Sequence, residues 1–433
     1  MKRIRYQYLI TLAGILVYSL VGHSAITATE LSSYVAKTDF ASFYTAANSI
    51  ASDAVDWNEI LELPLRVDGQ FPISFLAMSK IIFGEFGLFF VILSQVSIFI
   101  FAAKYFQRSL LNSKNKDWIV FLLCLFPSVM VSLIFPHKDA LYYSGLLICL
   151  GFFFRIITKS KIRLADYVTL LFGVFIVWLV RPYFSNVVGV VVIVGALSCY
   201  VIQRSLRKQI SVFAPVLGIC ICFLPVSLEK GYQIINTIIH DTYNTSEIAT
   251  SSTLSGAEIL ESDINPPTSP ITSPNTSPPL SVIETIINEV SKVRRGFASV
   301  DKGEEYLLSS KTSFYDYQDF AVEAISSFVG LLFSPLHNNE RPLNLSELRL
   351  GELVYLIDMA VLSLGLLFCG KMIASKTMAG SCIYLLIVCS TILAIIAIFV
   401  IDEPLALRLR AVVPHAFAIF LASYWRIDRG PVH

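Results

Sequence analysis

The sequence has 433 residues, of which 55% are hydrophobic and 15% charged, and its mean hydropathy is +0.67. This apolar content lies well above that of a soluble globular protein, so the composition places the chain among integral membrane proteins. A formal net charge of +1 gives no overall field that would attract nucleic acid, and no nucleic-acid partner is expected.

The cysteines give no sign of a metal site or of a disulfide framework, because none has a histidine or second cysteine at the spacing of a zinc ligand set. All eight lie inside apolar runs, where a thiol behaves as a small hydrophobic group. They are Cys124, Cys149, Cys199, Cys220, Cys222, Cys369, Cys382 and Cys389. We therefore expect no metal and no cofactor.

A helix needs about 20 mostly apolar residues to cross the roughly 30 Å hydrocarbon core of a bilayer. This rule predicts ten spans and hence an all-α, polytopic transmembrane helix bundle. The spans cover residues 7–27, 86–105, 118–136, 140–157, 165–180, 183–203, 211–227, 352–370, 378–401 and 409–425.

The distribution of Lys and Arg predicts the orientation, because these residues concentrate in short cytoplasmic loops. With the N-terminus inside, the inner segments carry most of the basic residues, and the short outer loops carry Lys138, Arg181, Arg408 and Arg410. We therefore expect a multi-pass membrane protein with both termini in the cytoplasm.

Three regions follow from this topology. Residues 1–227 form a membrane module of seven spans, with a first outer loop at 28–85. Residues 228–351 form a long periplasmic loop, which contains a stretch at 262–280 dense in Pro, Ser and Thr. That composition predicts an extended linker without a packed core. Residues 352–433 form a second membrane module of three spans.

Three further segments predict helices that do not cross the membrane. The stretches 71–84 and 321–336 are apolar but short, contain charge and fall on the outer side. We expect both to lie in the membrane interface or to dip partway into it. The segment 282–300 has apolar residues at helical spacing and predicts a helix on the surface.

Asp39 is the candidate catalytic residue. It follows the first span in the sequence KTDFASFYTAA, at the outer membrane surface and among aromatic residues. A carboxylate in such a place can act as a general base for a sugar hydroxyl. The same aspartate also fits a helix cap, since it directly precedes an apolar helical pattern.

Two outer turns hold further candidates for binding a substrate phosphate. His137, Lys138 and Asp139 form a tight turn, in which the ammonium group of Lys138 can meet a lipid phosphate. A lysine that reaches the interface and pairs with Asp139 is an equal alternative. Arg181 can bind phosphate through its planar fork, or anchor the helix at the interface beside Trp178.

Arg408 and Arg410 lead into the last span and interrupt the expected charge bias, which favours an anionic ligand outside. If this stretch is helical, residues two apart point to different faces, and one arginine then faces solvent or pairs with Glu403. The sequence has no Walker motif, HExxH or GxSxG and no dinucleotide-binding glycine pattern, so the nucleotide, zinc-protease and esterase classes lack support.

Several of these segments resemble integral membrane glycosyltransferases of the GT-C type and O-antigen polymerase-like proteins of surface polysaccharide synthesis. Asp39–Ala47 is similar to the first outer loop of the GT-C type, and Phe71–Leu76 up to Gly84 is similar to its short jaw helix. The segments similar to the polymerase-like group are His137–Leu141, Arg181-Pro182, Arg408–Arg410 with Pro414, and Phe333–Leu336 with Glu352.

The resemblance implies inverting sugar transfer from a polyprenyl-phosphate or pyrophosphate carrier, with Asp39 as base and the Lys and Arg residues on phosphate. It also implies a place in a bacterial inner membrane, and other membrane proteins of polysaccharide assembly as partners. The sequence departs from the pattern in its first loop, where a second acidic residue would stand close to the first. Here Asp53 and Asp56 follow more than ten residues later.

Two other classes of function compete with this hypothesis. A transporter or flippase of lipid-linked oligosaccharides would carry charges near the membrane midplane, where the sequence offers Asp358 inside a predicted span. A membrane-anchored receptor would use the long outer loop, so deletion of residues 240–310 would remove its function.

Overall fold

The computed structural model describes the N-terminal module in seven ranges and the rest of the chain in shorter parts. The N-terminal ranges are 2–27, 39–52, 71–110, 126–134, 138–158, 162–181 and 185–202. The others are 313–314, 317–333, 350–376, 379–400, 403–424 and most residues from 287 to 295. Within these ranges every regular element is a helix and there is no strand, which confirms the predicted all-α class there.

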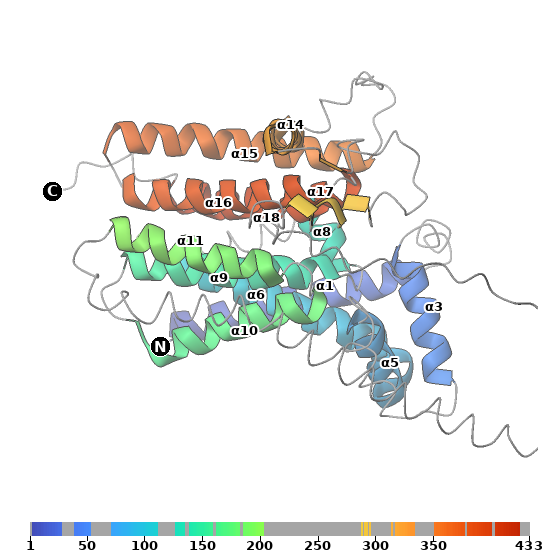
Figure 1. The fold of residues 1–433 in the computed structure, drawn as a ribbon. Coiled ribbons are helices and arrows are strands. Elements are labelled where there is room, and N and C mark those ends of the chain that lie inside the picture. Colours follow the sequence, from blue (N-terminus) through green and yellow to red (C-terminus); the bar gives the residue numbers. More distant parts are fainter. Residues whose placement is uncertain are drawn as a thin grey trace, which may run out of the picture.

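The helices of the N-terminal module are α1 (Lys2–Thr27), α3 (Asp39–Ser52), α5 (Phe71–Phe83), a 3₁₀ turn η1 (Gly84–Phe86), α6 (Gly87–Ser109), α8 (Pro127–Ile134), α9 (Lys138–Thr158), α10 (Leu164–Val180) and α11 (Ser185–Ile202). In the first half of the chain the long helices α1, α6, α9, α10 and α11 run roughly parallel in one bundle, whereas the short helix α3 stands across one end of it (Figure 1). The helices of the C-terminal part are α14 (Tyr317–Phe333), α15 (Leu350–Ala374), α16 (Ala379–Phe399), α17 (Glu403–Arg410) and α18 (Val412–Tyr424).

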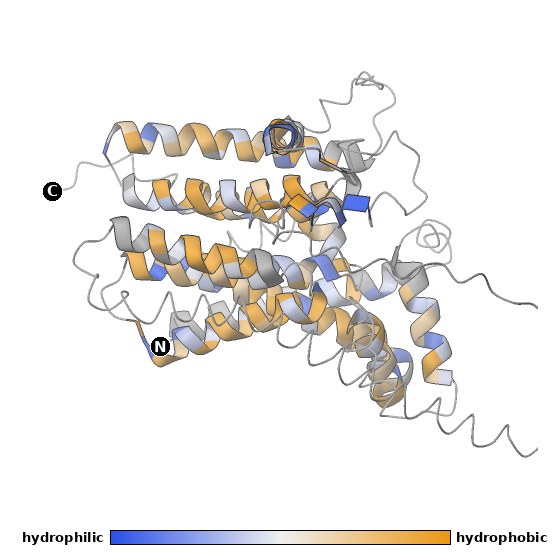
Figure 2. Cartoon of the chain, in the orientation of Figure 1, coloured by the Kyte–Doolittle hydropathy of each residue, from blue (hydrophilic) through white to orange (hydrophobic). Residues whose placement is uncertain are grey.

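Five helical stretches are long and apolar enough to cross a membrane: Phe71–Ser109, Lys138–Thr158, Val354–Ala374, Gly380–Phe399 and Ala406–Tyr424. Apolar residues cover most of their length (Figure 2). The structure thus supports a membrane protein with several spanning helices, whereas the full count of ten stays a prediction. The predicted span 211–227 lies outside the described residues.

Helices α9 and α10 pack most closely where two glycines face each other. A Cβ atom on Gly145 would lie 2.6 Å from the carbonyl oxygen of Gly173, and one on Gly173 would lie 2.7 Å from Cγ2 of Ile148. The two backbones approach this closely because neither glycine carries a side chain.

Side-chain contacts fix the direction of the neighbouring helices. Nζ of Lys104 donates to Oγ1 of Thr11 at 2.6 Å, and the rings of His23 and Phe89 lie 6.5 Å apart, so α1 and α6 run antiparallel. Helices α15 and α18 run in the same direction, since the ring of Phe420 meets Phe368 and a Cβ on Gly365 would meet Phe417.

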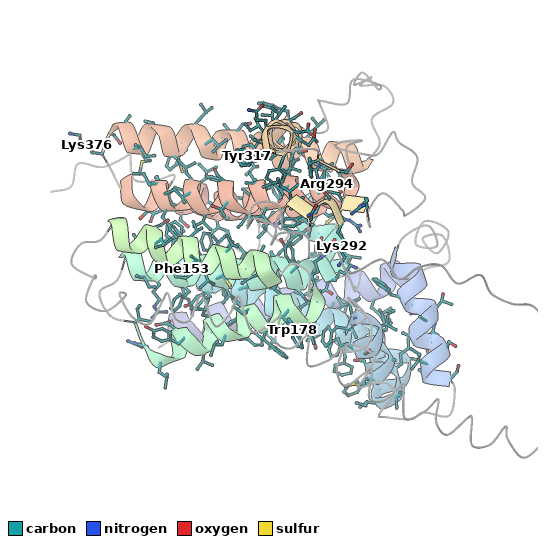
Figure 3. All side chains as sticks on the ribbon, in the orientation of Figure 1. Phe153, Trp178, Lys292, Arg294, Tyr317 and Lys376 are labelled. Carbon is teal, nitrogen blue, oxygen red and sulfur yellow. The ribbon has the colours of Figure 1, made fainter. Side chains whose placement is uncertain are left out.

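These directions give the bundle two distinct ends. At one end, which we call the α17 end, lie the start of α9, the end of α10, the start of α15, and helices α8, α14 and α17 (Figure 1). The opposite end holds Lys376, far from Arg294 at the α17 end (Figure 3). Toward that opposite end, α6, α9, α10 and α15 carry basic residues within the helix or directly beside it: Lys104, Arg108, Arg155, Arg163, Lys371 and Lys376.

The predicted short helix at 71–84 is present as α5, separate from the span that follows it. The chain turns at Gly84, whose φ of +58° is a backbone conformation that glycine adopts without strain. Helix α6 then starts against α5, because a Cβ on Gly87 would lie 2.6 Å from the backbone nitrogen of Lys80.

The other two predicted short helices are also present in the described residues. Helix α14 (Tyr317–Phe333) corresponds to the prediction at 321–336. The described residues from 287 to 295 are helical, with Ile287, Val290 and Arg294 buried on one face. This spacing confirms the amphipathic pattern, although a fully buried arginine was not expected there.

Candidate functional site

The carboxylate of Asp139 and the guanidinium of Arg181 form a buried ion pair at the α17 end. Asp139 lies in the first turn of α9, and Arg181 directly follows α10, where its backbone N–H caps the carbonyl of Val177 at 2.8 Å. Arg181 also lies over the ring of Tyr142, with 5.7 Å to its centroid. The charge of Arg181 is therefore compensated by Asp139 inside the bundle. Arg181 is not an exposed side chain that anchors the helix at the membrane interface.

Lys138 connects the start of α9 to helix α3. Its Nζ atom lies 5.8 Å from the ring centroid of Phe43, which stands four residues after Asp39. Helix α3 begins at Asp39, as the N-terminal signal predicts. The side chain of Asp39 lies outside the described part of the structure, and so does all of His137.

Arg408 and Arg410 point in different directions, as their spacing on a helix predicts. Arg410 is buried and donates through Nη1 to the carbonyl of Leu331, so it ties α17 to α14. The side chain of Arg408 is half-buried, and its backbone carbonyl accepts a hydrogen bond from Oη of Tyr143 at 2.7 Å. The side chain of Glu403, the alternative partner, lies outside the described residues.

Tyr355 on α15 joins these charges into one cluster. The charged side chains of Asp139, Asp358, Arg408 and Arg410 all act electrostatically on its hydroxyl. The structure thus brings charges of α9 together with charges of α15 and α17, which lie more than 200 residues later in the sequence. Of the predicted site residues, it places Lys138, Asp139, Arg181, Arg408 and Arg410 at the same end of the bundle.

Next to this cluster lies a buried group that sequence reasoning identified only in part. Oγ of Ser128 on α8 donates to Oδ1 of Asp358 at 3.0 Å and lies 2.8 Å from Nε2 of His415 on α18. Asp358 is 1% exposed and His415 is fully buried. A histidine inside a predicted span was a usable signal, because ionisable residues are costly there. Ser128 carried no signal.

The ring of His415 links this group to the charged cluster. It lies edge-on to Tyr143, with 5.2 Å between ring centroids, and Tyr143 bonds to the backbone of Arg408. Among the described residues no group of three His, Cys, Asp or Glu side chains could hold a metal ion.

Arg294 is a second buried charge that the sequence did not single out. Its Nε atom donates to the carbonyl of Ile398 at 2.8 Å, and Nη2 donates to the carbonyl of Ala397 and to Ser327 at 3.2 Å. Burial lowers the pKa of Arg294 below its ordinary value, and the carboxylate of Glu323, 3.4 Å away, offsets part of this shift. This fully engaged arginine fastens its helix to α14 and α16.

Comparison with known proteins gives no relative: no family model, no curated protein and no solved structure matches this chain.

Proposed function

We propose that this protein is a membrane glycosyltransferase of the GT-C type that polymerises or extends a surface polysaccharide. Its substrates are sugars linked to polyprenyl phosphate or pyrophosphate, and it works at the periplasmic face of a bacterial inner membrane. The observation that supports this proposal most is the gathering of Lys138, Arg181, Arg408 and Arg410 at one end of an apolar bundle.

A lipid-linked sugar matches such a surface in its chemistry. Its hydrocarbon tail lies in the bilayer, while its phosphate lies at the membrane surface, where fixed cations neutralise it. The proposal assigns the phosphate to the half-buried side chains of Lys138 and Arg408. The paired Arg181 is assigned a positioning role, because Asp139 already compensates its charge.

Asp39 is the proposed general base. Phe43, four residues later on the same face of α3, contacts Lys138, and this register supports a place for Asp39 near the start of α9. Asp39 would take the proton of the acceptor hydroxyl, whose oxygen then forms a bond to the anomeric carbon. The bond from that carbon to the phosphate oxygen breaks, and its electron pair leaves with the lipid phosphate.

The stabilisation of this leaving group is the larger contribution in the proposed mechanism. Preorganised cations near a developing negative charge act without reorganising during the reaction, and such electrostatic terms usually dominate catalysis. A low-dielectric bundle beside the site strengthens them further.

The proposed topology has ten spans, both termini in the cytoplasm and residues 228–351 in the periplasm. The described basic residues toward the opposite end of the bundle support it, because basic residues concentrate on the cytoplasmic side. Cysteine labelling from outside tests it directly. We expect labelling of cysteines introduced near Lys138 and Arg408, and none near Lys376.

The genetic test is the polysaccharide pattern of a strain that lacks the gene and carries plasmid-borne variants. We expect loss or shortening of the polysaccharide in the knockout, restoration by the wild-type gene, and failure of Asp39→Asn and Lys138→Gln at normal protein levels. A knockout with one repeat unit per lipid would indicate a polymerase, and one with an altered repeat a single-sugar transferase. Wild-type polysaccharide in both point variants would refute the assigned site.

A transporter or flippase of the same lipids is the second candidate, favoured by the buried Asp358 and His415 in candidate spanning helices. Detergent separates the two classes, since transport needs two sides of a membrane and sugar transfer does not. We expect the purified protein to elongate a lipid-linked acceptor in detergent micelles. Movement of lipid in proteoliposomes without such elongation would favour the transporter.

A further inference from the structure

The two hydrogen bonds of Ser128 define which atom donates and which atom accepts along the series His415, Ser128 and Asp358. A serine hydroxyl carries a single hydrogen, and here Oγ donates it to Oδ1 of Asp358. The contact of 2.8 Å with Nε2 of His415 must then be donated by the imidazole, so a neutral His415 carries its hydrogen on Nε2. Two hydrogen bonds in series therefore run from His415 through Ser128 to Asp358.

Both ends of this series are open acceptors inside the bundle. Oδ2 of Asp358 and Nδ1 of His415 are buried and have no hydrogen-bond partner in the part of the chain that the structure describes. An unsatisfied buried acceptor costs about 1–3 kcal/mol, so one at each end of the same series needs a reason. A proton is a ligand that both the imidazole and the carboxylate can take without rearranging the helices around them.

We propose that His415, Ser128 and Asp358 form a proton relay within the helix bundle. A proton that binds Nδ1 of His415 allows Nε2 to pass its own proton to Oγ of Ser128, which passes its proton to Asp358. The imidazole ends neutral with its hydrogen on Nδ1, the serine ends unchanged, and the carboxylate ends protonated. The reverse sequence returns the proton, and no other reactant is consumed.

The relay takes one member from each of three helices, so a shift of α8, α15 or α18 breaks it. Its electrostatic surroundings come from α9, α15 and α17. The titratable and charged groups that act on Asp358, Tyr355 or Tyr143 there are Asp139, Tyr143, Tyr355, Arg408 and Arg410. Arg410 attracts the charged carboxylate of Asp358, and protonation of Asp358 removes this attraction. The protonation state of the relay is therefore coupled to the charged cluster at the α17 end.

Infrared difference spectroscopy of the full-length protein in lipid nanodiscs tests the relay without reference to any activity. We expect a carboxylic-acid C=O band that titrates with pH and is absent in Asp358→Asn. His415→Gln and Ser128→Ala should each move its pH midpoint by about one unit or more, because coupled sites interact by at least that much. Ser144→Ala, which removes a buried hydroxyl bonded to the carbonyl of Ala140, is the control and should leave the midpoint unchanged.

A second measurement uses the wild-type protein alone, in case a variant fails to fold. A hydrophobic carbodiimide attacks protonated carboxyl groups in apolar surroundings, and peptide mass spectrometry locates the adduct. We expect modification of Asp358 that rises as the pH falls. The proposal is wrong if Asp358 stays unmodified and yields no carboxylic-acid band at any pH. It is equally wrong if folded His415→Gln and Ser128→Ala leave the midpoint in place.

Discussion

Asp139 and Arg181 close one end of the α9–α10 hairpin with the same arrangement that Asp166 and Arg155 use at the other end, where Nη1 and Oδ1 are 2.7 Å apart. Each aspartate lies in the first turn of its helix, and each arginine lies at the end of the other helix. Carboxylates at N-termini and cations at C-termini both interact favourably with the helix dipoles, so the two pairs stabilise an antiparallel hairpin.

The two pairs differ in burial, which predicts different costs when one partner is removed. Arg181→Ala leaves the carboxylate of Asp139 buried without its cation and should destabilise the protein by about 3–5 kcal/mol. Arg155→Ala removes a partner whose side chain is 22% exposed, so water reaches that site and the loss should be smaller. Thermal unfolding in one detergent compares the two variants.

A double variant separates the charge from the packing in this experiment. Asp139→Leu combined with Arg181→Met removes both charges and should recover much of the stability that Arg181→Ala loses, because no uncompensated charge remains. Equal losses in Arg155→Ala and Arg181→Ala would show that burial of the pair has no energetic consequence.

The glycine contact inside the same hairpin gives a second prediction. Gly145→Ala places a methyl group 2.6 Å from the carbonyl oxygen of Gly173, a backbone atom that cannot turn away. Forcing the helices apart should cost about 1–3 kcal/mol. Gly370→Ala is the matched control, since no atom lies within 4 Å of its added Cβ and alanine is the better helix former. An unfolding temperature of Gly145→Ala at or above that of Gly370→Ala would contradict the close approach.

The helices at 71–83 and 317–333 and the different directions of Arg408 and Arg410 were predictable from the sequence, because they follow from local rules. Apolar length and helical spacing depend on neighbouring residues alone. The charge bias assigned Lys138, Arg181, Arg408 and Arg410 to one side of the membrane, and the structure places them at one end of the bundle, while their side of the membrane stays a prediction.

The partners of the buried charges could not be predicted in this way. Asp358 bonds to Ser128, 230 residues earlier, and Arg294 bonds to backbone carbonyls of Ala397 and Ile398. Such contacts depend on how helices from distant parts of the sequence pack, and a backbone carbonyl leaves no mark in the residue type. Sequence reasoning for Arg181 likewise gave phosphate or the interface as its partner, because the distance to Asp139 across the hairpin was unknown.

Two cations at the α17 end should contribute to substrate binding if the proposed function is correct. Lys138→Gln and Arg408→Gln each remove one charge-assisted contact to phosphate, worth about 1.5–3 kcal/mol, or roughly 10- to 150-fold in kcat/KM for a lipid-linked donor. Lys376→Gln, at the opposite end of the bundle, is the control and should behave as wild type (Figure 3). Unchanged kcat/KM in both variants would exclude these side chains from the phosphate site.

Arg294 provides a test of the helical segment at 287–295 that does not depend on the proposed chemistry. The carbonyls of Ala397 and Ile398 belong to the last turn of α16, where they lack partners within the helix, and Arg294 acts as their cap. Arg294→Ala leaves buried acceptors unsatisfied, at about 1–3 kcal/mol for each such group, and also removes the cationic partner of Glu323. We expect a lower unfolding temperature and faster protease cleavage near residues 287–295. Arg295→Ala, at an exposed position next to it, should change the stability by about 0.5 kcal/mol or less. If both variants resisted protease equally, the cap would not be what holds this helix against α14 and α16.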